Sequence, residues 1–273
     1  MTDLPIRLIA TDLDGTLLDY HGEMVPENIG AIRAAQEMGV TVAIATGRFP
    51  ENAYLKILDS GLTCPIMGEN GASIVDEQLR PLSMHAMDPE AARRTLEIIR
   101  DFGADSYIFG YKVICTTRID AHHHSELSQG DRIGKLGIRY VHGMDAAEEM
   151  VRGPVHKFYI CDNVPLEPIR RAIKEIPNVA VTRSAQFNVE VMAKGVDKGS
   201  GLKELAALLG VPMAQTMALG DHDNDAPMLK AAGWGVAMEN GSEKAKKAAR
   251  FITADCREGG FARAVEKYVL NER

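Results

Sequence analysis

Two aspartates stand one residue apart, directly after a short apolar run. The run covers residues 8–10, and Asp-Leu-Asp-Gly-Thr follows at residues 12–16. An apolar run that enters a glycine-containing turn is typical of a buried strand, and ligands of open parallel sheets bind at the carboxyl ends of strands. Two such carboxylates can divide a phosphoryl transfer, because Asp12 can serve as covalent nucleophile while Asp14 protonates the leaving oxygen. Taken alone, a polar turn after a strand is an equally good interpretation.

Three further segments could complete such a site. Thr46-Gly47 ends an apolar run and offers a hydroxyl and a flexible amide to phosphate oxygens. Lys198 precedes a helical pattern, where its ammonium could neutralise a phosphate. Residues 220–225, Gly-Asp-His-Asp-Asn-Asp, crowd three carboxylates together, which raises carboxyl pKa values unless a cation compensates. Oxygen ligands beside a phosphate suit Mg²⁺, so we expect this cofactor.

The elements that must position these residues alternate between strand and helix patterns. Early strands are expected at 6–10, 40–45 and 65–67 and early helices at 26–38 and 52–58, followed by a hairpin at 72–75 and 79–84. Later helices are expected at 199–209, 227–232, 242–249 and 260–269, with strands at 216–219, 235–238 and 251–253. This alternation predicts an α/β fold with a Rossmann-like parallel sheet and right-handed crossovers.

The middle of the chain has a different pattern. Helices are expected at 89–102 and 166–176, strands at 107–116, 155–161, 179–182 and 188–192, and a loop or broken helix at 120–137. Such a mixture is typical of an α+β module. We therefore predict a core domain formed by residues 1–84 and 190–273, with a cap domain of residues 85–189 inserted into it. The short segment between Asp12 and Thr46 leaves no room for a cap there.

Composition limits the classes of partner. The chain has 273 residues, is 45% hydrophobic and carries a formal net charge of −7, which argues against nucleic acid as a partner. No apolar stretch approaches the roughly 20 residues of a membrane span, and the first residues lack the pattern of an export signal. The four cysteines lie far apart without a CxxC pair, as expected for reduced thiols of a cytoplasmic protein. We expect a monomer or weak homodimer.

Together the four motifs resemble those of the haloacid dehalogenase-like phosphatases, specifically the Cof-type group with a type IIB cap. The matching segments are Asp12–Thr16, Thr46–Arg48, Lys194–Gly199 and Gly220–Asp225. The resemblance extends to residues 69–72 and 235–238 and covers essentially the whole length, although the cap matches by layout more than by residues. Family members often have glycine where this chain has Glu239, so a local effect beside the metal site is expected.

The resemblance implies roles for the acidic residues. Asp12 would be the nucleophile and a Mg²⁺ ligand, and Asp14 would be the general acid and base, binding the metal through its backbone carbonyl. Asp221 would complete the metal site. Asp225 would support it from the outer shell or serve as an occasional ligand.

The resemblance also implies a set of phosphate contacts, which comprises the amide of Leu13 together with Thr46, Gly47, Lys198 and Asn224. Further contacts to the substrate are expected from Arg48 and Asn70. Two polar residues near the return from the cap, Gln186 and Asn188, are candidates as well. For these two, an ordinary role as polar strand residues is an equally good interpretation.

We predict a Mg²⁺-dependent phosphatase that hydrolyses a small phosphorylated metabolite through an aspartyl-phosphate intermediate. A sugar phosphate or a phosphorylated cofactor is the expected substrate. One alternative is a phosphomutase like the phosphomannomutases, although the cap lacks an evident arginine-rich clamp. The other is a non-catalytic regulatory module that binds phosphate, against which the intact acidic residues argue. Three consecutive histidines at 122–124 are interpreted as a surface loop and not as a metal site.

Overall fold

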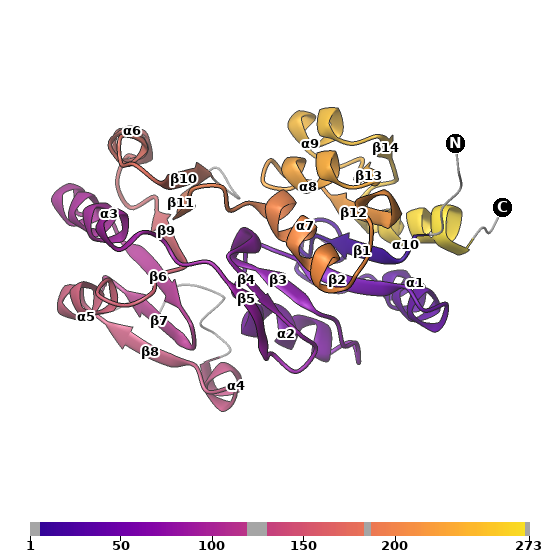
Figure 1. Ribbon diagram of the computed structural model, residues 1–273, viewed down its shortest axis with the longest axis horizontal. Helices are drawn as coiled ribbons and strands as arrows, with labels where there is room; N and C mark the ends of the chain where they lie inside the picture. The colour runs from indigo at the N-terminus through magenta and orange to yellow at the C-terminus, as the bar shows by residue number, and fades with distance from the viewer. Residues whose placement is uncertain (1–5, 119–129, 183–186, 271–273) are drawn as a thin grey trace. The chain divides into compact units, whose positions relative to one another are not determined.

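The computed structural model describes residues 6–118, 130–182 and 187–270 (Figure 1). The chain divides into two compact units. We call Met1–Ser83 with Asp197–Arg273 the core unit, and Met84–Val196 the cap unit.

The core unit contains an eight-stranded sheet with the order β14-β13-β12-β1-β2-β3-β4-β5. β1 lies inside the sheet and pairs in parallel with β2 and β12, and β4 runs antiparallel to its neighbour β3. The strands are β1 (Leu8–Thr11), β2 (Thr41–Ala45), β3 (Ile66–Gly68), β4 (Ser73–Val75), β5 (Pro81–Met84), β12 (Thr216–Gly220), β13 (Trp234–Ala237) and β14 (Phe251–Ile252).

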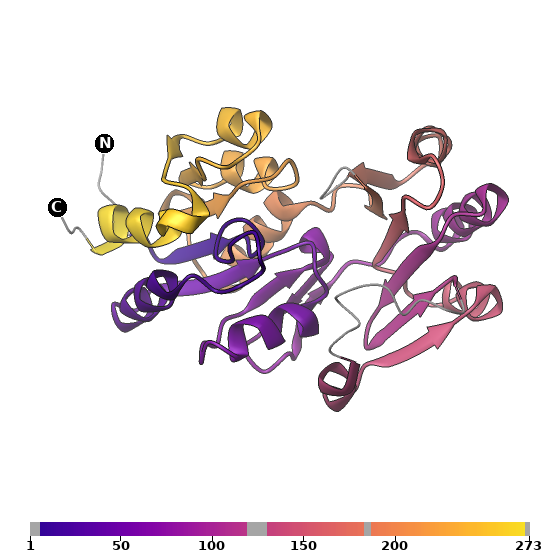
Figure 2. The same ribbon diagram turned by 180° about the vertical axis from the view of Figure 1, so that it is seen from behind.

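Helices cover both faces of this sheet. α7, α8 and α9 lie on the face seen in Figure 1, and α1, α2 and α10 lie on the face seen in Figure 2. The helices are α1 (Pro26–Glu37), α2 (Pro50–Leu58), α7 (Lys198–Leu208), α8 (Ala226–Ala231), α9 (Glu243–Ala248) and α10 (Gly260–Val265). Short helical turns occur at η1 (Glu69–Gly71), η3 (Met213–Gln215), η4 (Cys256–Glu258) and η5 (Glu266–Leu270).

Burial on both faces explains why the central strands are continuously apolar. All four residues of β1 are buried. Because side chains alternate along a strand, Leu8 and Ala10 share one face and pack in a cluster with Leu202 of α7 and Met228 of α8. The sheet is therefore held rigidly from both sides, and the loops at its ends carry the polar residues.

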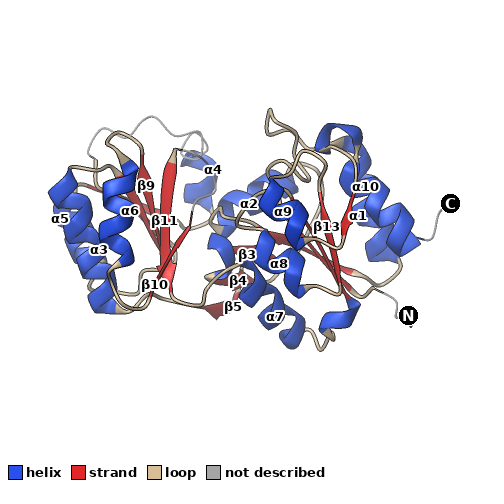
Figure 3. Cartoon of the chain, turned by 90° about the horizontal axis from the view of Figure 1, so that it is seen from above, coloured by secondary structure: helices blue, strands red, loops and turns tan. Residues whose placement is uncertain are grey.

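The cap unit is an α+β module with a six-stranded sheet of the order β10-β11-β9-β6-β7-β8. Its strands are β6 (Ser106–Gly110), β7 (Val113–Thr116), β8 (Arg139–His142), β9 (Lys157–Cys161), β10 (Val179–Thr182) and β11 (Asn188–Ala193). Its helices are α3 (Pro89–Phe102), α4 (Gly130–Lys135), α5 (Met144–Met150) and α6 (Leu166–Lys174). In Figure 3, α3, α5 and α6 lie on one side of this sheet.

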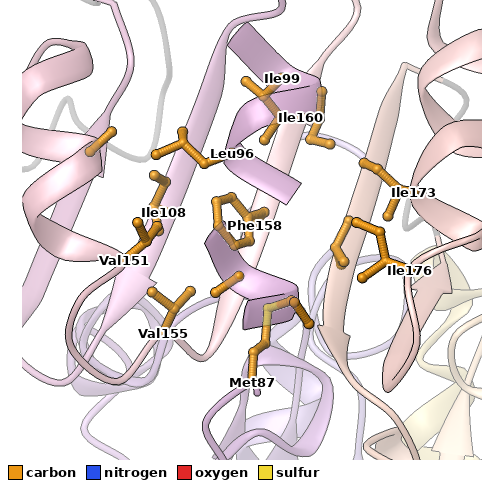
Figure 4. Close-up of a cluster of buried hydrophobic side chains, with 14 of the residues drawn as sticks. Met87, Leu96, Ile99, Ile108, Val151, Val155, Phe158, Ile160, Ile173 and Ile176 are labelled. Atoms are coloured by element: carbon orange, nitrogen blue, oxygen red, sulfur yellow. The ribbon is translucent and has the colours of Figure 1, made fainter. Parts of the chain in front are cut away.

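Phe158 of β9 occupies the middle of the cap core and is completely buried (Figure 4). It packs in one cluster with Leu96 and Ile99 of α3, Ile108 of β6 and Ile173 of α6. The apolar face of α3 begins after Asp88, whose side chain accepts a hydrogen bond from Ala91 N as an N-cap. The sheet and its helices thus enclose a hydrophobic core that is separate from that of the core unit.

The predicted α/β core with an inserted α+β module is confirmed, but details of the cap differ. The segment 107–116, expected as one strand, is the hairpin of β6 and β7, which turns at Lys112 with a φ of 57°. β8 and α5 were not predicted. β11 pairs with β9 and β10 and extends to Ala193, so the predicted domain edge at 189/190 falls inside a strand. The histidines at 122–124 lie outside the described residues.

Among the described residues, no helix combines the length and the apolar character that crossing a membrane requires.

Candidate active site

Three of the predicted site segments follow neighbouring strands of the core sheet. In the parallel register, Thr11 at the end of β1 pairs with Leu219 of β12 and with Ile44 of β2. Because parallel strands end at the same edge, the residues after β1, β2 and β12 emerge close together. The sheet thereby brings together Asp12, Thr46 and Asp221, which are up to 209 positions apart along the chain.

Lys198 reaches this edge from the first turn of α7. Asp197 caps the helix, since its side chain accepts from Ser200 N while Asp197 N donates to Ser200 Oγ. The completely buried Lys198 Nζ donates to Asp12 Oδ1 at 2.7 Å and to Asp225 Oδ1 at 2.5 Å. Lys198 therefore joins two predicted site segments through one buried ammonium.

Three carboxylates crowd around that ammonium. Asp12, Asp221 and Asp225 can each offer an oxygen within 4.8 Å of the others. Burial and the neighbouring Asp225 raise the pKa of Asp12 well above its ordinary value, although Lys198 acts in the opposite direction. Burial and Asp225 likewise raise the pKa of Asp221 to about 7. One ammonium is thus insufficient compensation for the cluster.

Lys198 itself remains positively charged. Burial alone would lower the pKa of its ammonium, but Asp12 and Asp225 raise it above the ordinary value. Asp225 is completely buried, and its second oxygen accepts from the amides of Asp221 and His222 at 3.0 and 2.8 Å. Asp225 therefore has most of its acceptor positions occupied by the protein, whereas Asp221 accepts from Thr16 Oγ1 at 3.0 Å.

The donor set fits a hard divalent cation. Carboxylate oxygens are the ligands that Mg²⁺ prefers, and the raised pKa values of Asp12 and Asp221 indicate negative charge that a cation would compensate. The loop after β1 approaches Asp221 closely at Gly15, which has a φ of 77°. A Cβ at residue 15 would lie 2.6 Å from Asp221 Oδ2.

Asp14 lies in a more open environment than Asp12. Its carboxylate is half-exposed and accepts two hydrogen bonds from the guanidinium of Arg48, both at 2.7 Å. Arg48 also donates to Asn52 Oδ1 at 2.6 Å. The structure thus pairs Arg48, a predicted substrate contact, with the predicted acid and base, and Asn52 is a partner that the sequence did not suggest.

Three of the predicted phosphate residues, Thr46, Gly47 and Asn224, lie around Asn70, whose N donates to Thr46 O at 2.9 Å. Thr46 Oγ1 accepts from Arg48 N at 3.1 Å, and Asn224 Nδ2 donates to Asn70 Oδ1 at 2.9 Å. A Cβ built at Gly47 would lie 3.3 Å from Asn70 Oδ1, so the paired amides lie against the Gly47 backbone. Leu13 is completely buried between the two aspartates.

Two predicted contacts belong to the cap. Asn188 is buried in β11, and Gln186 lies outside the described residues. Their contacts with a substrate stay predictions.

The loop after β13 holds residues that sequence reasoning missed. Asn240 Nδ2 donates to Gly15 O at 2.8 Å, and Asn240 Oδ1 accepts from Cys256 N. Ser242 N donates to Asp221 O at 2.7 Å. The sequence signal that could have identified this loop is the pair Asn240-Gly241 shortly after the apolar run of β13. The neighbouring Glu239 is exposed and does not have a positive φ, and its expected local effect beside the metal site stays a prediction.

Comparisons with known proteins agree on one family. Residues 9–265 match the model of the haloacid dehalogenase-like hydrolases. The chain is 31% identical to a provisionally named phosphatase of Streptococcus pyogenes serotype M6, over 98% of this chain and 100% of that one. It is 29% identical to 5-amino-6-(5-phospho-D-ribitylamino)uracil phosphatase YcsE of Bacillus subtilis, over 98% of each chain. A solved haloacid dehalogenase-like hydrolase from B. subtilis is similar with a TM-score of 0.83 and 26% identity, covering 96% of this chain and 99% of that one.

Proposed function

Because this chain belongs to the haloacid dehalogenase-like hydrolases, as a phosphatase of the Cof type, we propose that it hydrolyses a small phosphorylated metabolite with the help of Mg²⁺. The observation that carries the proposal is the buried contact of Lys198 with Asp12. It holds a carboxylate at the end of β1 beside a fixed positive charge. Such an arrangement allows an anionic nucleophile to approach an anionic phosphate.

In the proposed reaction, Asp12 attacks phosphorus and the bond to the leaving oxygen breaks. Asp14 donates a proton to that oxygen, and then takes a proton from the water that hydrolyses the aspartyl phosphate. The half-exposed position of Asp14 suits this role, because its carboxylate is accessible once Arg48 releases it. Arg48 would then be free to contact the phosphate or the leaving group.

The remaining site residues would hold phosphate and metal. Lys198, Thr46, Gly47, Asn224 and the amide of Leu13 are the proposed phosphate contacts. Mg²⁺ would be held by the carboxylates of Asp12 and Asp221 and by the backbone carbonyl of Asp14, and when bound it supplies positive charge beside the reacting phosphate. Asp225 supports this site, since its oxygens already bind Lys198 and two backbone amides.

The proposed substrate class is a sugar phosphate or a phosphorylated cofactor. The name of the B. subtilis relative specifies a phosphorylated ribityl chain attached to a uracil ring, which combines features of both groups. That compound is therefore the first candidate to test. A cytoplasmic location and a monomeric or weakly dimeric state stay predictions.

A phosphate-release screen tests the proposal. The purified protein is incubated with a panel of sugar phosphates, phosphorylated cofactors and the ribitylaminouracil phosphate, with Mg²⁺ and with EDTA. We expect release that requires Mg²⁺ and that Asp12→Asn abolishes while the circular dichroism spectrum is unchanged. Phosphate transfer between substrate positions without release would instead indicate a mutase. Substantial release by the Asp12→Asn variant would refute the assigned nucleophile.

A further inference from the structure

The turn η1 between β3 and β4 contains two adjacent residues in an unfavourable backbone conformation. Glu69 has a φ of 52° and Asn70 a φ of 58°, and both are almost completely buried. Side chains with a Cβ rarely adopt positive φ, although asparagine tolerates it better than most. Among the described residues, this is the only adjacent pair of non-glycine residues with positive φ. Such strain persists where the surroundings determine the conformation, and it is frequent at functional sites.

The surroundings of the turn are the loops of the candidate active site. Asn70 N donates to Thr46 O at 2.9 Å, and Glu69 N donates to Arg48 O at 2.8 Å. The next residue, Gly71, has a φ of 97°, and a Cβ there would lie 2.6 Å from the carbonyl oxygen of Asp197. The turn therefore contacts both the loop after β2 and the residue that precedes Lys198.

The side chain of Asn70 extends this contact to a third loop. Its Oδ1 accepts from Asn224 Nδ2 at 2.9 Å, and the exposed fractions of the two residues are 1% and 9%. An amide nitrogen carries two hydrogens, so this contact leaves one for another acceptor. Within the described part of the chain, Asn224 Oδ1 is buried without a hydrogen-bond partner. One N–H of the Asn224 amide is thus held by Asn70, while its second N–H and its Oδ1 are left beside Gly47 for another hydrogen-bond partner.

We propose that Asn70 is a positioning residue of the phosphate site. It holds the amide of Asn224 so that the second N–H of that amide points at a phosphate oxygen. The inference rests on the proposed function, because the bound group is taken to be phosphate. It also assigns Asn70 a role other than the direct substrate contact expected from the sequence. The side chain of Asn70 binds the amide of Asn224, which is a proposed phosphate contact, whereas the proposed metal ligands are Asp12, Asp14 and Asp221. We therefore expect its replacement to weaken phosphate binding more than metal binding.

The test is the substitution Asn70→Gly, since glycine adopts positive φ readily and lacks the amide. The affinity of the Mg²⁺-loaded protein for inorganic phosphate is measured by calorimetry, and KM, kcat and the Mg²⁺ activation constant are measured with a substrate from the screen. We expect phosphate affinity to fall about tenfold, which corresponds to about 1.4 kcal/mol. KM should rise similarly, while the Mg²⁺ activation constant stays within about twofold of the wild-type value. The matched control is Ser73→Ala, which removes a buried hydroxyl that has no hydrogen-bond partner among the described residues and should leave all four quantities unchanged.

A double-mutant cycle separates positioning from an independent effect. If Asn70 acts through Asn224, the double variant Asn70→Gly/Asn224→Ala should bind phosphate no more weakly than Asn224→Ala alone. Additive losses would overturn the inference, as would unchanged phosphate affinity in Asn70→Gly. Equal losses in Mg²⁺ and phosphate affinity would indicate a merely structural role and would overturn it too. Wild-type protein that binds phosphate but hydrolyses no substrate would refute the proposed function alone, because the binding comparison would still be valid.

Discussion

Replacing Lys198 by methionine should destabilise the core unit strongly, because it leaves Asp12 and Asp225 without their shared cation. Lys198 is completely buried, and its Nζ lies 2.7 and 2.5 Å from the two carboxylates. Methionine has a similar length and fills most of the same space. The variant Lys198→Met therefore tests the charge more than the packing.

The magnitude follows from the distances and the burial. With an effective dielectric constant of about 20, a unit charge pair at these distances attracts by about 6 kcal/mol, and the desolvation of the ammonium offsets much of this. Removal of one partner of a buried ion pair costs about 3–5 kcal/mol in measured cases. We expect a loss in that range without metal and a smaller loss with saturating Mg²⁺. Activity should be abolished in both conditions.

Urea denaturation followed by tryptophan fluorescence provides the assay. Trp234 is the only tryptophan of the chain and lies in β13, so its signal reports on the core unit. The matched control is Lys203→Met, an exposed lysine on the same helix, which should change the free energy of unfolding by less than about 0.5 kcal/mol.

A second substitution tests the cause of the loss. Lys198→Met/Asp225→Asn removes one of the two unpaired carboxylates and should recover at least half of the lost stability without recovering activity. A loss below about 1 kcal/mol in Lys198→Met would refute the electrostatic reasoning. Failure of Asp225→Asn to restore stability would refute it as well.

Three further outcomes are expected. Asp14→Asn should slow both release of the leaving group and breakdown of the aspartyl phosphate, so unchanged single-turnover rates would contradict the role of Asp14. Without metal, the folded protein holds a proton on Asp221 up to a pKa of about 7, whereas the unfolded chain releases it near the ordinary value of 3.8. Stability from this group is therefore fully present below 3.8 and is lost as the pH rises through 7. Urea midpoints should fall between pH 5 and pH 7.5 in EDTA and fall less in Mg²⁺; a midpoint that rises over this interval in EDTA would count against the assignment. Glu239→Gly should change kcat/KM by less than about threefold, because Glu239 is exposed with ordinary φ; a larger change would reveal a role that the contacts do not show.

Much of the candidate site could be predicted because its residues stand at strand ends. The apolar runs before Asp12 and Asp221 are long enough to indicate buried strands, and neighbouring parallel strands bring their carboxyl ends together. Hydrogen-bond partners that come together only in the folded structure could not be predicted. Asn240 donates a hydrogen bond to Gly15 O, which is 225 positions away along the chain, and nothing in the local sequence of either residue specifies that contact. The pairing of Arg48 with Asp14 likewise depends on how the loops after β1 and β2 are oriented.

The strands of the core unit could be predicted from their apolar runs, whereas several strands of the cap unit could not. Strands buried on both faces have continuous apolar runs, but strands of the cap sheet are short and partly exposed. β8 has two exposed and two partly exposed residues, which gives no clear alternation. The turn between β6 and β7 contains Tyr111 and Lys112 in place of the usual Asn-Gly signal, and Lys112 adopts positive φ without being a favoured residue for it. The end of β11 was missed because Ala193 lies just beyond the last strongly apolar residue of that strand.

The pairing of β1 with β12 has a consequence for biosynthesis. β2 ends at Ala45 and β12 begins at Thr216, so the ribosome adds residues 46–215 between them, and one edge of β1 has no partner during that part of translation. The cap unit, by contrast, is continuous in sequence and has its own apolar core, so it can fold while the core unit is half made. The nascent chain must therefore protect the open edge of a largely apolar strand, and the interval before residue 220 is its period of greatest exposure to aggregation.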